Sequence, residues 1–406
     1  MNKKIGPVLL SGLMIGPILG SGIILLPPMA YNSIGSWSLL AWIIILILGV
    51  FFAMCFSKLS ILKPGDGGMT NAIEETMGKK WKLFSSLAMI SAVLAGPTAV
   101  MLTASSYLVK VSPLTFIPES IMAVILVLLA FILLLKELKV VSMISFIVSS
   151  LIAIILIASS LMIVFDKGII IQSQNISIMD FGKCILLLFW AIIGWEVVGN
   201  YTGQVRNVKK DISIATSISA IIISLTYMLV AIAINNVGIK NVSLVEVISP
   251  IFASSSSNVL AVLITGLCLS TYLLIVGAVG RLIRSLSEEK YLGKIFSNNT
   301  ATGIPYIAIA VLSCIHILVL IMNYFNILSI DVIVNWANGF FIGNAIIGLI
   351  ATYKISDDLV LKISSVFLIV CLTVLLAFSS LFSIAGLIVV YFLAERFERK
   401  RAVITE

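Results

Sequence analysis

The chain has 406 residues, of which 60% are hydrophobic and only 11% are charged. A soluble domain carries about a quarter charged residues, so this composition excludes an ordinary water-soluble fold and favours an all-α polytopic membrane protein. The formal net charge of +8 does not indicate a nucleic-acid surface, because the basic residues lie mainly in short segments between apolar runs.

Apolar runs long enough to cross a bilayer recur along the chain. About 20 such residues span the hydrocarbon core as a helix. The predicted spans are 7–31, 37–62, 83–109, 117–135, 140–165, 182–203, 212–236, 256–283, 304–323, 328–353, 359–377 and 381–395. We therefore predict about twelve transmembrane helices in a single membrane domain over 1–406, with a C-terminal helix pair over 359–395.

The positions of the basic residues predict how these helices are oriented. Lys and Arg concentrate in cytoplasmic loops. With the N-terminus placed inside, all but four of the 26 Lys and Arg residues fall on the cytoplasmic side, the exceptions being Lys110, Lys167, Lys183 and Lys240. We expect a multi-pass protein of the cell membrane with both termini in the cytoplasm.

The first predicted helix contains helix-breaking residues in the middle of its span. Its sequence MIGPILGSGIILLPP places Gly20 and Gly22 on either side of Ser21. Unwinding there leaves backbone N–H groups without intrahelical partners at the positive end of the next half-helix, which suits a carboxylate. We predict that Gly20, Ser21 and Gly22 belong to a substrate site.

The sixth predicted helix is interrupted at GWEVVGN, residues 194–200. The half-helix that leads into Gly194 should end in free carbonyl groups near Trp190 and Ile193, and these suit an ammonium group or a cation. One break thus offers donors and the other offers acceptors. Together they match a zwitterion such as an α-amino acid.

The two interrupted helices begin two units of five helices, over 7–165 and 182–353. Because five is odd, the second unit must be inverted relative to the first. Inverted repeats with broken helices are typical of secondary transporters that bind substrate near the midplane. The alternative, that the glycines only allow close helix packing, explains one break better than two corresponding ones.

Three further polar side chains lie in apolar spans. Glu196, beside the second break, is costly in the bilayer interior and could exchange a proton, or else tie the sixth helix to a neighbour. Ser270 and Thr271 in the eighth helix could complete a sodium site with backbone carbonyls, or else bond only to their own helix.

Residues for metal binding or catalysis are few. The five cysteines are scattered singly, and the one histidine, His316, lies in an apolar span where we expect it to be packed or hydrogen-bonded. We expect no enzyme, no bound metal and no cofactor, with H+ or Na+ as the candidate coupling ion. The lack of an evident counter-charge at mid-depth favours neutral, apolar amino acids as substrates.

Three motifs resemble the amino acid–polyamine–organocation superfamily: GSGIILLPP in the first helix, FWAIIGWEVVGN in the sixth, and KPGDGG after the second. The resemblance implies a LeuT-type 5+5 inverted repeat with broken helices 1 and 6. It implies carboxylate binding by the main chain at Ser21 and Gly22, and amino-group binding by the carbonyls of Ile18, Trp190 and Ile193. It also implies that Glu196 corresponds to a glutamate that the family has in helix 6.

The stretch AGPTAV, residues 95–100, is most similar to bacterial exporters of methionine and branched-chain amino acids. Two features depart from the family pattern. The loop NVKKDISIA, residues 207–215, lacks both prolines that relatives often have there, and the predicted helix over 140–165 lacks the lysine of some proton-coupled relatives.

These observations predict a secondary active transporter that moves amino acids by alternating access, through symport, exchange or efflux. Its partners would be a small-molecule substrate and the lipid bilayer, without nucleic acid. The alternatives left open are an amino-acid sensor built on a transporter fold and a transporter of another small amine or cation. The sequence predicts no oligomeric state.

Overall fold

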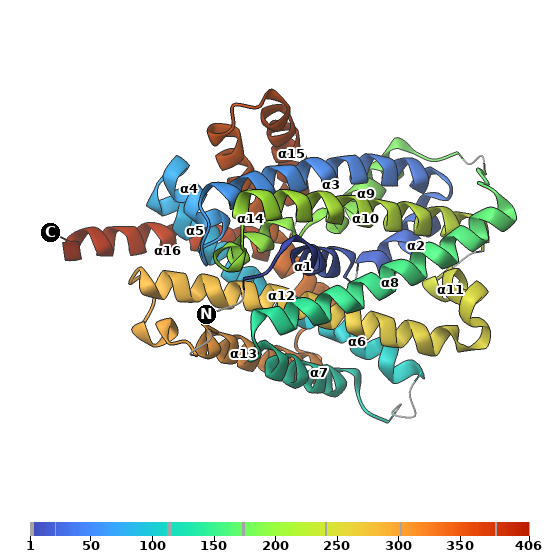
Figure 1. Cartoon of the computed structure of the whole chain (residues 1–406), viewed down its shortest axis with the longest axis horizontal. Helices are drawn as coiled ribbons and strands as arrows, with labels where there is room; N and C mark the ends of the chain where they lie inside the picture. Colours follow the sequence, from blue (N-terminus) through green and yellow to red (C-terminus); the bar gives the residue numbers. More distant parts are fainter. Residues whose placement is uncertain are drawn as a thin grey trace.

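The computed structural model describes residues 4–20, 22–111, 116–172, 175–239, 242–300, 303–377 and 380–405. Most of the long helices that these residues form run side by side along the longest axis of the molecule (Figure 1). Within this part of the chain, ten spans are long and apolar enough to cross a membrane. The predicted all-α polytopic membrane fold is confirmed.

The helices follow the predicted spans closely. The α-helices are α1 Pro7–Leu19, α2 Gly22–Ile34, α3 Trp37–Leu62, α4 Met69–Met77, α5 Lys79–Val93, α6 Gly96–Val111, α7 Glu119–Leu134, α8 Leu138–Lys167, α9 Ile178–Leu188, α10 Val208–Val237, α11 Leu244–Phe252, α12 Ser256–Glu288, α13 Tyr306–Tyr324, α14 Ile330–Ile355, α15 Leu359–Ala377 and α16 Leu381–Thr405. Short 3₁₀ segments are η1 Phe189–Ile192, η2 Trp195–Gln204, η3 Ala253–Ser255 and η4 Lys294–Ser297. Two of the twelve predicted spans are not among the ten membrane-spanning segments. One coincides with α7, which is apolar but shorter than those segments, and the other coincides with α16.

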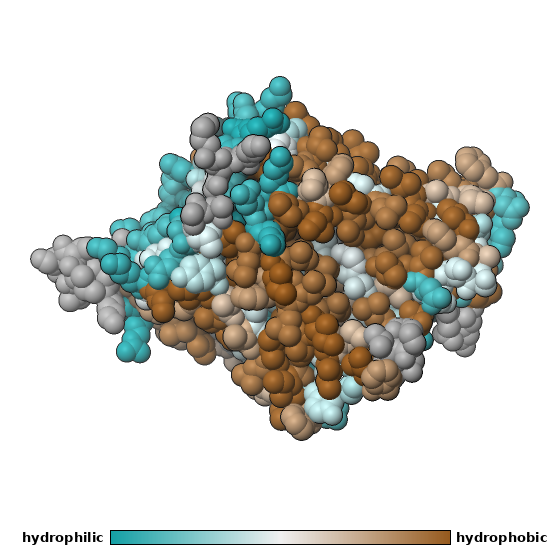
Figure 2. Space-filling view, turned by 60° about the horizontal axis from the view of Figure 1, so that its bottom comes forward, coloured by the Kyte–Doolittle hydropathy of each residue, from teal (hydrophilic) through white to brown (hydrophobic). Residues whose placement is uncertain are grey.

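The outer surface of the bundle is apolar. Figure 2 shows a hydrophobic band between more hydrophilic ends. Long helices present large side chains outward, such as Ile154 of α8, Ile221 of α10 and Val262 of α12, each more than half exposed. An apolar surface of this extent is unfavourable in water and favourable in lipid. The protein is therefore a multi-pass membrane protein.

The two predicted helix breaks are present. The first predicted helix is divided into α1 and α2 at Gly20, whose φ of 31° lies in the left-handed region that glycine tolerates. The sixth changes from α9 into η1 and η2, and Gly194 between them has φ of 126°. The second half of this helix is thus a 3₁₀ segment rather than the α-helix that the apolar pattern suggested.

Two further features were not predicted. The third predicted span is divided into α5 and α6 by a break at residues 94–95, just before Pro97. The eighth is preceded by a separate short helix, α11, which packs against α12. A proline inside a helix removes one hydrogen bond and crowds the preceding turn, which accounts for the first of these differences.

Helix α1 lies in the middle of the bundle, in contact with α8, α10 and α12 (Figure 1). Helix α3 packs in turn on α10, η1 and η2, while α6 packs on α12 and α7 on α13. Two repeats related by a twofold axis would produce these pairings. The division of the chain into repeats over 7–165 and 182–353 itself stays a prediction.

Candidate substrate site at the two helix breaks

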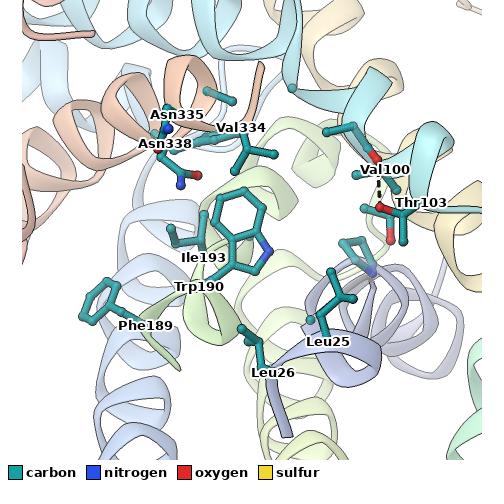
Figure 3. A pocket seen from close by; sticks show the side chains of 18 of the residues that line it. Leu25, Leu26, Val100, Thr103, Phe189, Trp190, Ile193, Val334, Asn335 and Asn338 are labelled. Carbon is teal, nitrogen blue, oxygen red and sulfur yellow. Dashed lines mark hydrogen bonds between the residues drawn. The ribbon is translucent and has the colours of Figure 1, made fainter. Parts of the chain in front are cut away.

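A cavity of about 560 Å³ lies where the two breaks meet. Its volume is within the range of small-molecule sites, which is about 300–1,000 Å³. Residues of α1, α2, α6, η1, α12 and α14 line it, and the indole of Trp190 lies between Val334 on one side and Leu25 and Leu26 on the other (Figure 3). The structure therefore brings the two interrupted segments to one site.

The first break contributes main-chain groups to this cavity. Ile18 and Gly22 line it, and the first N–H groups of α2 after Gly22 have no intrahelical acceptor. Gly20 ends α1, and its own N–H bonds to the carbonyl of Gly16 at 2.8 Å. Ser21, which the sequence placed in the same site, lies outside the described residues.

A tyrosine that the sequence analysis missed supports the first break. The Oη of Tyr227 in α10 donates to the carbonyl oxygen of Ile18 at 3.0 Å, and its ring stacks on Trp42 with centroids 4.7 Å apart. Tyr227 is fully buried. It holds the end of α1 in place and leaves one lone pair of the Ile18 carbonyl for another donor.

The second break contributes Trp190, Ile193 and Gly194 to the cavity wall. Ile193 is extended, with φ of −81° and ψ of 137°, so the chain leaves the helical path there. Carbonyl groups in such a segment are not all used within the helix and can accept hydrogen bonds from a ligand. The three predicted residues of this break thus lie together at the site.

Glu196 lies behind this break and does not line the cavity. Its side chain is buried, with an exposed fraction of 2%, and its Oε2 accepts a hydrogen bond of 3.0 Å from the N–H of Gly194. Its Oε1 has no hydrogen-bond partner within the described part of the chain. The carboxyl group therefore stabilises the turn at Gly194, while its predicted coupling to protons stays a prediction.

Ser270 and Thr271 face the first break from α12. The Thr271 hydroxyl donates to the carbonyl of Leu267 at 3.0 Å and lies 3.3 Å from that of Gly16. The Ser270 hydroxyl is buried without a hydrogen-bond partner among the described residues, and a Cβ added to Gly16 would lie 2.5 Å from it. Oxygen atoms from α1 and α12 thus lie close together. Oxygen is the ligand atom that hard cations prefer.

The remaining walls are mostly apolar. Asp331, at the start of α14, is the one residue with a formal charge among the described residues that line the cavity. Asn335 and Asn338 project from the same helix (Figure 3). The Thr103 hydroxyl is already bonded to the carbonyl of Ala99 at 2.9 Å. The cavity therefore offers few polar side chains to a ligand.

The site is covered at the end of the bundle from which α1 begins. Ile5 pairs with the end of η2 and the chain just after it, through bonds to Gln204 at 2.9 Å and Arg206 at 3.1 Å. The loop within KPGDGG also bonds to η2, from Gly65 N to Thr202 Oγ1 at 2.7 Å and from Asn200 Nδ2 to Asp66 O at 2.9 Å. The cavity extends the opposite way, toward Met29 and Asp331.

A multi-pass helical bundle with two broken helices around a central cavity has the architecture of a secondary transporter. The model of the family described as amino acid permease matches residues 5–402, nearly the whole chain. The chain therefore belongs to the amino acid permease family, within the amino acid–polyamine–organocation superfamily, and is an amino acid transporter by family. The comparison with curated proteins finds no match.

Proposed function

We propose that this permease carries neutral amino acids with apolar side chains. The observation that supports this most directly is the single cavity shared by the breaks at Gly20 and Gly194, with mainly apolar side chains around it. An acidic side chain would lose its hydration there without gaining a charged partner, and a basic side chain would find only Asp331 among the described residues that line the cavity.

The substrate carboxylate would lie at the start of α2, where the first N–H groups have no acceptor within their own helix and the helix dipole is positive. Its ammonium group would donate to carbonyls near Ile18, Trp190 and Ile193. The side chain would then point among Leu25, Val100 and Trp190. This arrangement recognises the part common to all α-amino acids with main-chain atoms and leaves selection to the apolar walls.

Transport would proceed by alternating access. In the conformation described, the cavity extends from the breaks toward Met29 and Asp331, while the Ile5 and Asp66 segments cover the opposite end. With the orientation predicted from the basic residues, this is an outward-facing state. Movement of the covering segments away from η2 would open the other side and release the substrate by symport, exchange or efflux.

The coupling ion would act at one of two places. Glu196 carries a carboxyl oxygen without a partner in the described residues and touches the main chain of the second break. Ser270 and Thr271 offer hydroxyl oxygens beside the carbonyl of Gly16. A proton at the first place or a sodium ion at the second would change the charge or geometry next to a substrate-binding break.

Uptake into proteoliposomes tests this proposal. The purified protein would be reconstituted and supplied with labelled leucine, methionine, glutamate and arginine, with a pH gradient, a sodium gradient, or unlabelled amino acid inside. We expect saturable flux of leucine and methionine and little flux of the charged pair. Flux of the charged pair alone, or of no amino acid under any gradient, would overturn the proposal.

A further inference from the structure

The break between α5 and α6 leaves one carbonyl group that its own helix cannot bond. Pro97 has no N–H, and in an α-helix that N–H would bond to the carbonyl four residues earlier, which is that of Val93. Val93 ends α5 and Gly96 begins α6. A buried carbonyl without a donor is unfavourable, so a partner from elsewhere is required.

His316 supplies that partner from α13. Its Nε2 lies 2.7 Å from the Val93 carbonyl oxygen, and its Nδ1 lies 2.7 Å from the Oη of Tyr272 in α12. Because a carbonyl only accepts, Nε2 must carry the proton, and Nδ1 of the neutral ring then accepts from the tyrosine hydroxyl. The imidazole is fully buried, and both its nitrogen atoms are used.

Other side chains complete the break. The Nε1 of Trp336 in α14 donates to the carbonyl of Ser91 at 2.9 Å, and the Thr98 hydroxyl donates to that of Ala95 at 2.6 Å. The interrupted turn is thus held from α13 by His316 and from α14 by Trp336. Its bend is set by fixed side-chain donors rather than by the proline alone.

This bend determines where one wall of the substrate cavity lies. Residues just after the break line the cavity, among them Gly96, Ala99, Val100 and Thr103. A Cβ added to Gly96 would lie 2.9 Å from that of Ala337, so α6 already lies close against α14. Any change in the direction of α6 therefore moves Val100 and Thr103 relative to the bound side chain.

We propose that His316 is a positioning residue for substrate selection, acting through the Val93 carbonyl on the α6 wall. It touches no substrate itself. The link to Tyr272, which follows Thr271 in α12, joins this wall to the helix that faces the first break. The inference rests on the proposed amino acid transport, because selectivity is its readout.

The first experiment compares side-chain substitutions at His316. A glutamine places an amide nitrogen where Nε2 was, an asparagine reaches only the position of Nδ1, and a leucine provides neither group. We expect His316→Leu and His316→Asn to change the ratio of KM for leucine to KM for alanine by about fivefold or more, and His316→Gln by less than about twofold. Equal effects of His316→Gln and His316→Asn would overturn the proposal, and this pair decides even if His316→Leu does not fold.

The second experiment gives the Val93 carbonyl another donor, so that the hydrogen bond from His316 is no longer needed. Pro97→Ala restores the N–H that can bond to the Val93 carbonyl within the helix, so the effect of His316→Leu on the KM ratio should be much smaller in that background. A double-mutant cycle measures this difference. If His316→Leu changes the ratio equally with proline and with alanine at position 97, the carbonyl is not the route of its effect and the proposal is wrong.

The third experiment measures the accessibility of the α6 wall and does not depend on transport. A cysteine at Val100 would be labelled from outside with a membrane-impermeant thiol reagent, and labelling at that site measured by mass spectrometry. We expect His316→Leu to change the labelling rate about threefold or more and Pro97→Ala with His316→Leu to reduce that difference. An unchanged rate overturns the positioning role, whereas absent flux in the wild type with a changed rate would overturn only the transport proposal.

Discussion

The hydroxyl oxygen of Tyr227 lies 3.0 Å from the carbonyl oxygen of Ile18 and occupies the space into which a side chain on Gly22 would extend. A Cβ added at Gly22 would lie only 2.6 Å from that hydroxyl. The ring stacks on Trp42, so it has little freedom to move aside. The absence of a side chain at Gly22 therefore allows both the tyrosine bond and close approach of a ligand to the main chain.

Gly22→Ala is expected to raise KM for leucine about tenfold or more, because the added methyl group displaces Tyr227 and narrows the space at the start of α2. Tyr227→Phe removes the hydroxyl that bonds to the carbonyl of Ile18 at 3.0 Å and, more weakly, to that of Leu19 at 3.5 Å, and should raise KM by about two- to fivefold. Initial rates of uptake into proteoliposomes measure both. The matched control is Gly182→Ala in α9, where an added Cβ meets nothing within 4 Å. Unchanged KM in Gly22→Ala would place the carboxylate elsewhere.

Gly194→Ala tests the second break by backbone strain rather than by crowding. An added Cβ there would make only ordinary contact with Ile18 at 3.5 Å, but the φ of 126° is one that alanine rarely adopts. Such strain costs about 1–3 kcal/mol, so we expect a lower midpoint of thermal unfolding in detergent together with weaker binding. A variant as stable as the wild type would show that the turn tolerates a side chain and that its glycine has another role.

The broken spans could be predicted because Gly20, Gly22 and Gly194 interrupt otherwise apolar runs, and these glycines have a direct local effect on the helix. The break between α5 and α6 was not predicted, although Pro97 was visible, because a single proline can also bend a helix without ending it. Whether it does so depends on donors from distant segments, here His316 and Trp336.

Main-chain positions that line the cavity were named from the sequence, whereas the side chain that supports the first break was not. Trp190 and Ile193 follow from the position of the second break, and Ile18 follows from the family resemblance; their binding of substrate stays a prediction. Tyr227 lies in an apolar span with no local sign of its function, and its contact joins positions more than 200 residues apart. The sequence alone did not identify that contact. Contacts between helices that lie far apart in the sequence become visible only once the helices are packed.

Glu196→Gln tests proton coupling while keeping an acceptor for the N–H of Gly194, which now bonds to Oε2 at 3.0 Å. Glutamine does not titrate, so we expect leucine uptake to lose most of its dependence on pH and on a pH gradient while substrate binding is retained within about threefold. Initial rates between pH 5 and pH 8 measure the first, and a ligand-induced thermal shift measures the second. The same pH profile in Glu196→Gln and wild type would rule out this carboxyl as the coupling group.

Ser270→Ala tests sodium coupling with little structural cost. The hydroxyl has no partner among the described residues, so its removal should leave the thermal stability unchanged or slightly raised. If sodium binds there, the concentration for half-maximal stimulation of uptake should rise about tenfold in Ser270→Ala and in Thr271→Val.

Thr265→Val is the matched control in the same helix, because among the described residues the Thr265 hydroxyl bonds only to the carbonyl of Ala261, at 2.7 Å. We expect it to leave the sodium dependence unchanged. Sodium-stimulated uptake that is equal in Ser270→Ala, Thr271→Val and wild type would contradict a sodium site at these hydroxyls.

Arg281 in α12 tests closure of the covered end. Its guanidinium is buried, lies 4.7 Å from the ring centre of Tyr201 in η2, and donates to the carbonyl of Gly277 at 2.9 Å. Arg281→Met removes this contact with η2, so we expect the covered end to open more often. A cysteine at Val198 should then be labelled about threefold faster by a thiol reagent from that side. A labelling rate equal to that of the Val198→Cys protein alone would contradict this role.

Asp66, in the loop that covers the closed end, tests how the stability of the protein depends on pH. Burial raises the pKa of its carboxyl group above the ordinary value of 3.8, although Arg281 and Arg284 act in the opposite direction. A carboxyl group whose pKa is raised on folding contributes stability below its unfolded pKa, and this contribution is lost as the pH rises through the folded value. At neutral pH the charged form is therefore the costly one. Asp66→Asn, which keeps the backbone acceptor for Asn200, should leave the midpoint of thermal unfolding at pH 7 unchanged or raised, and should reduce its fall between pH 4 and pH 7. A lower midpoint at pH 7 would show instead that the ion pair with Arg284, at 3.5 Å, outweighs the cost of burial.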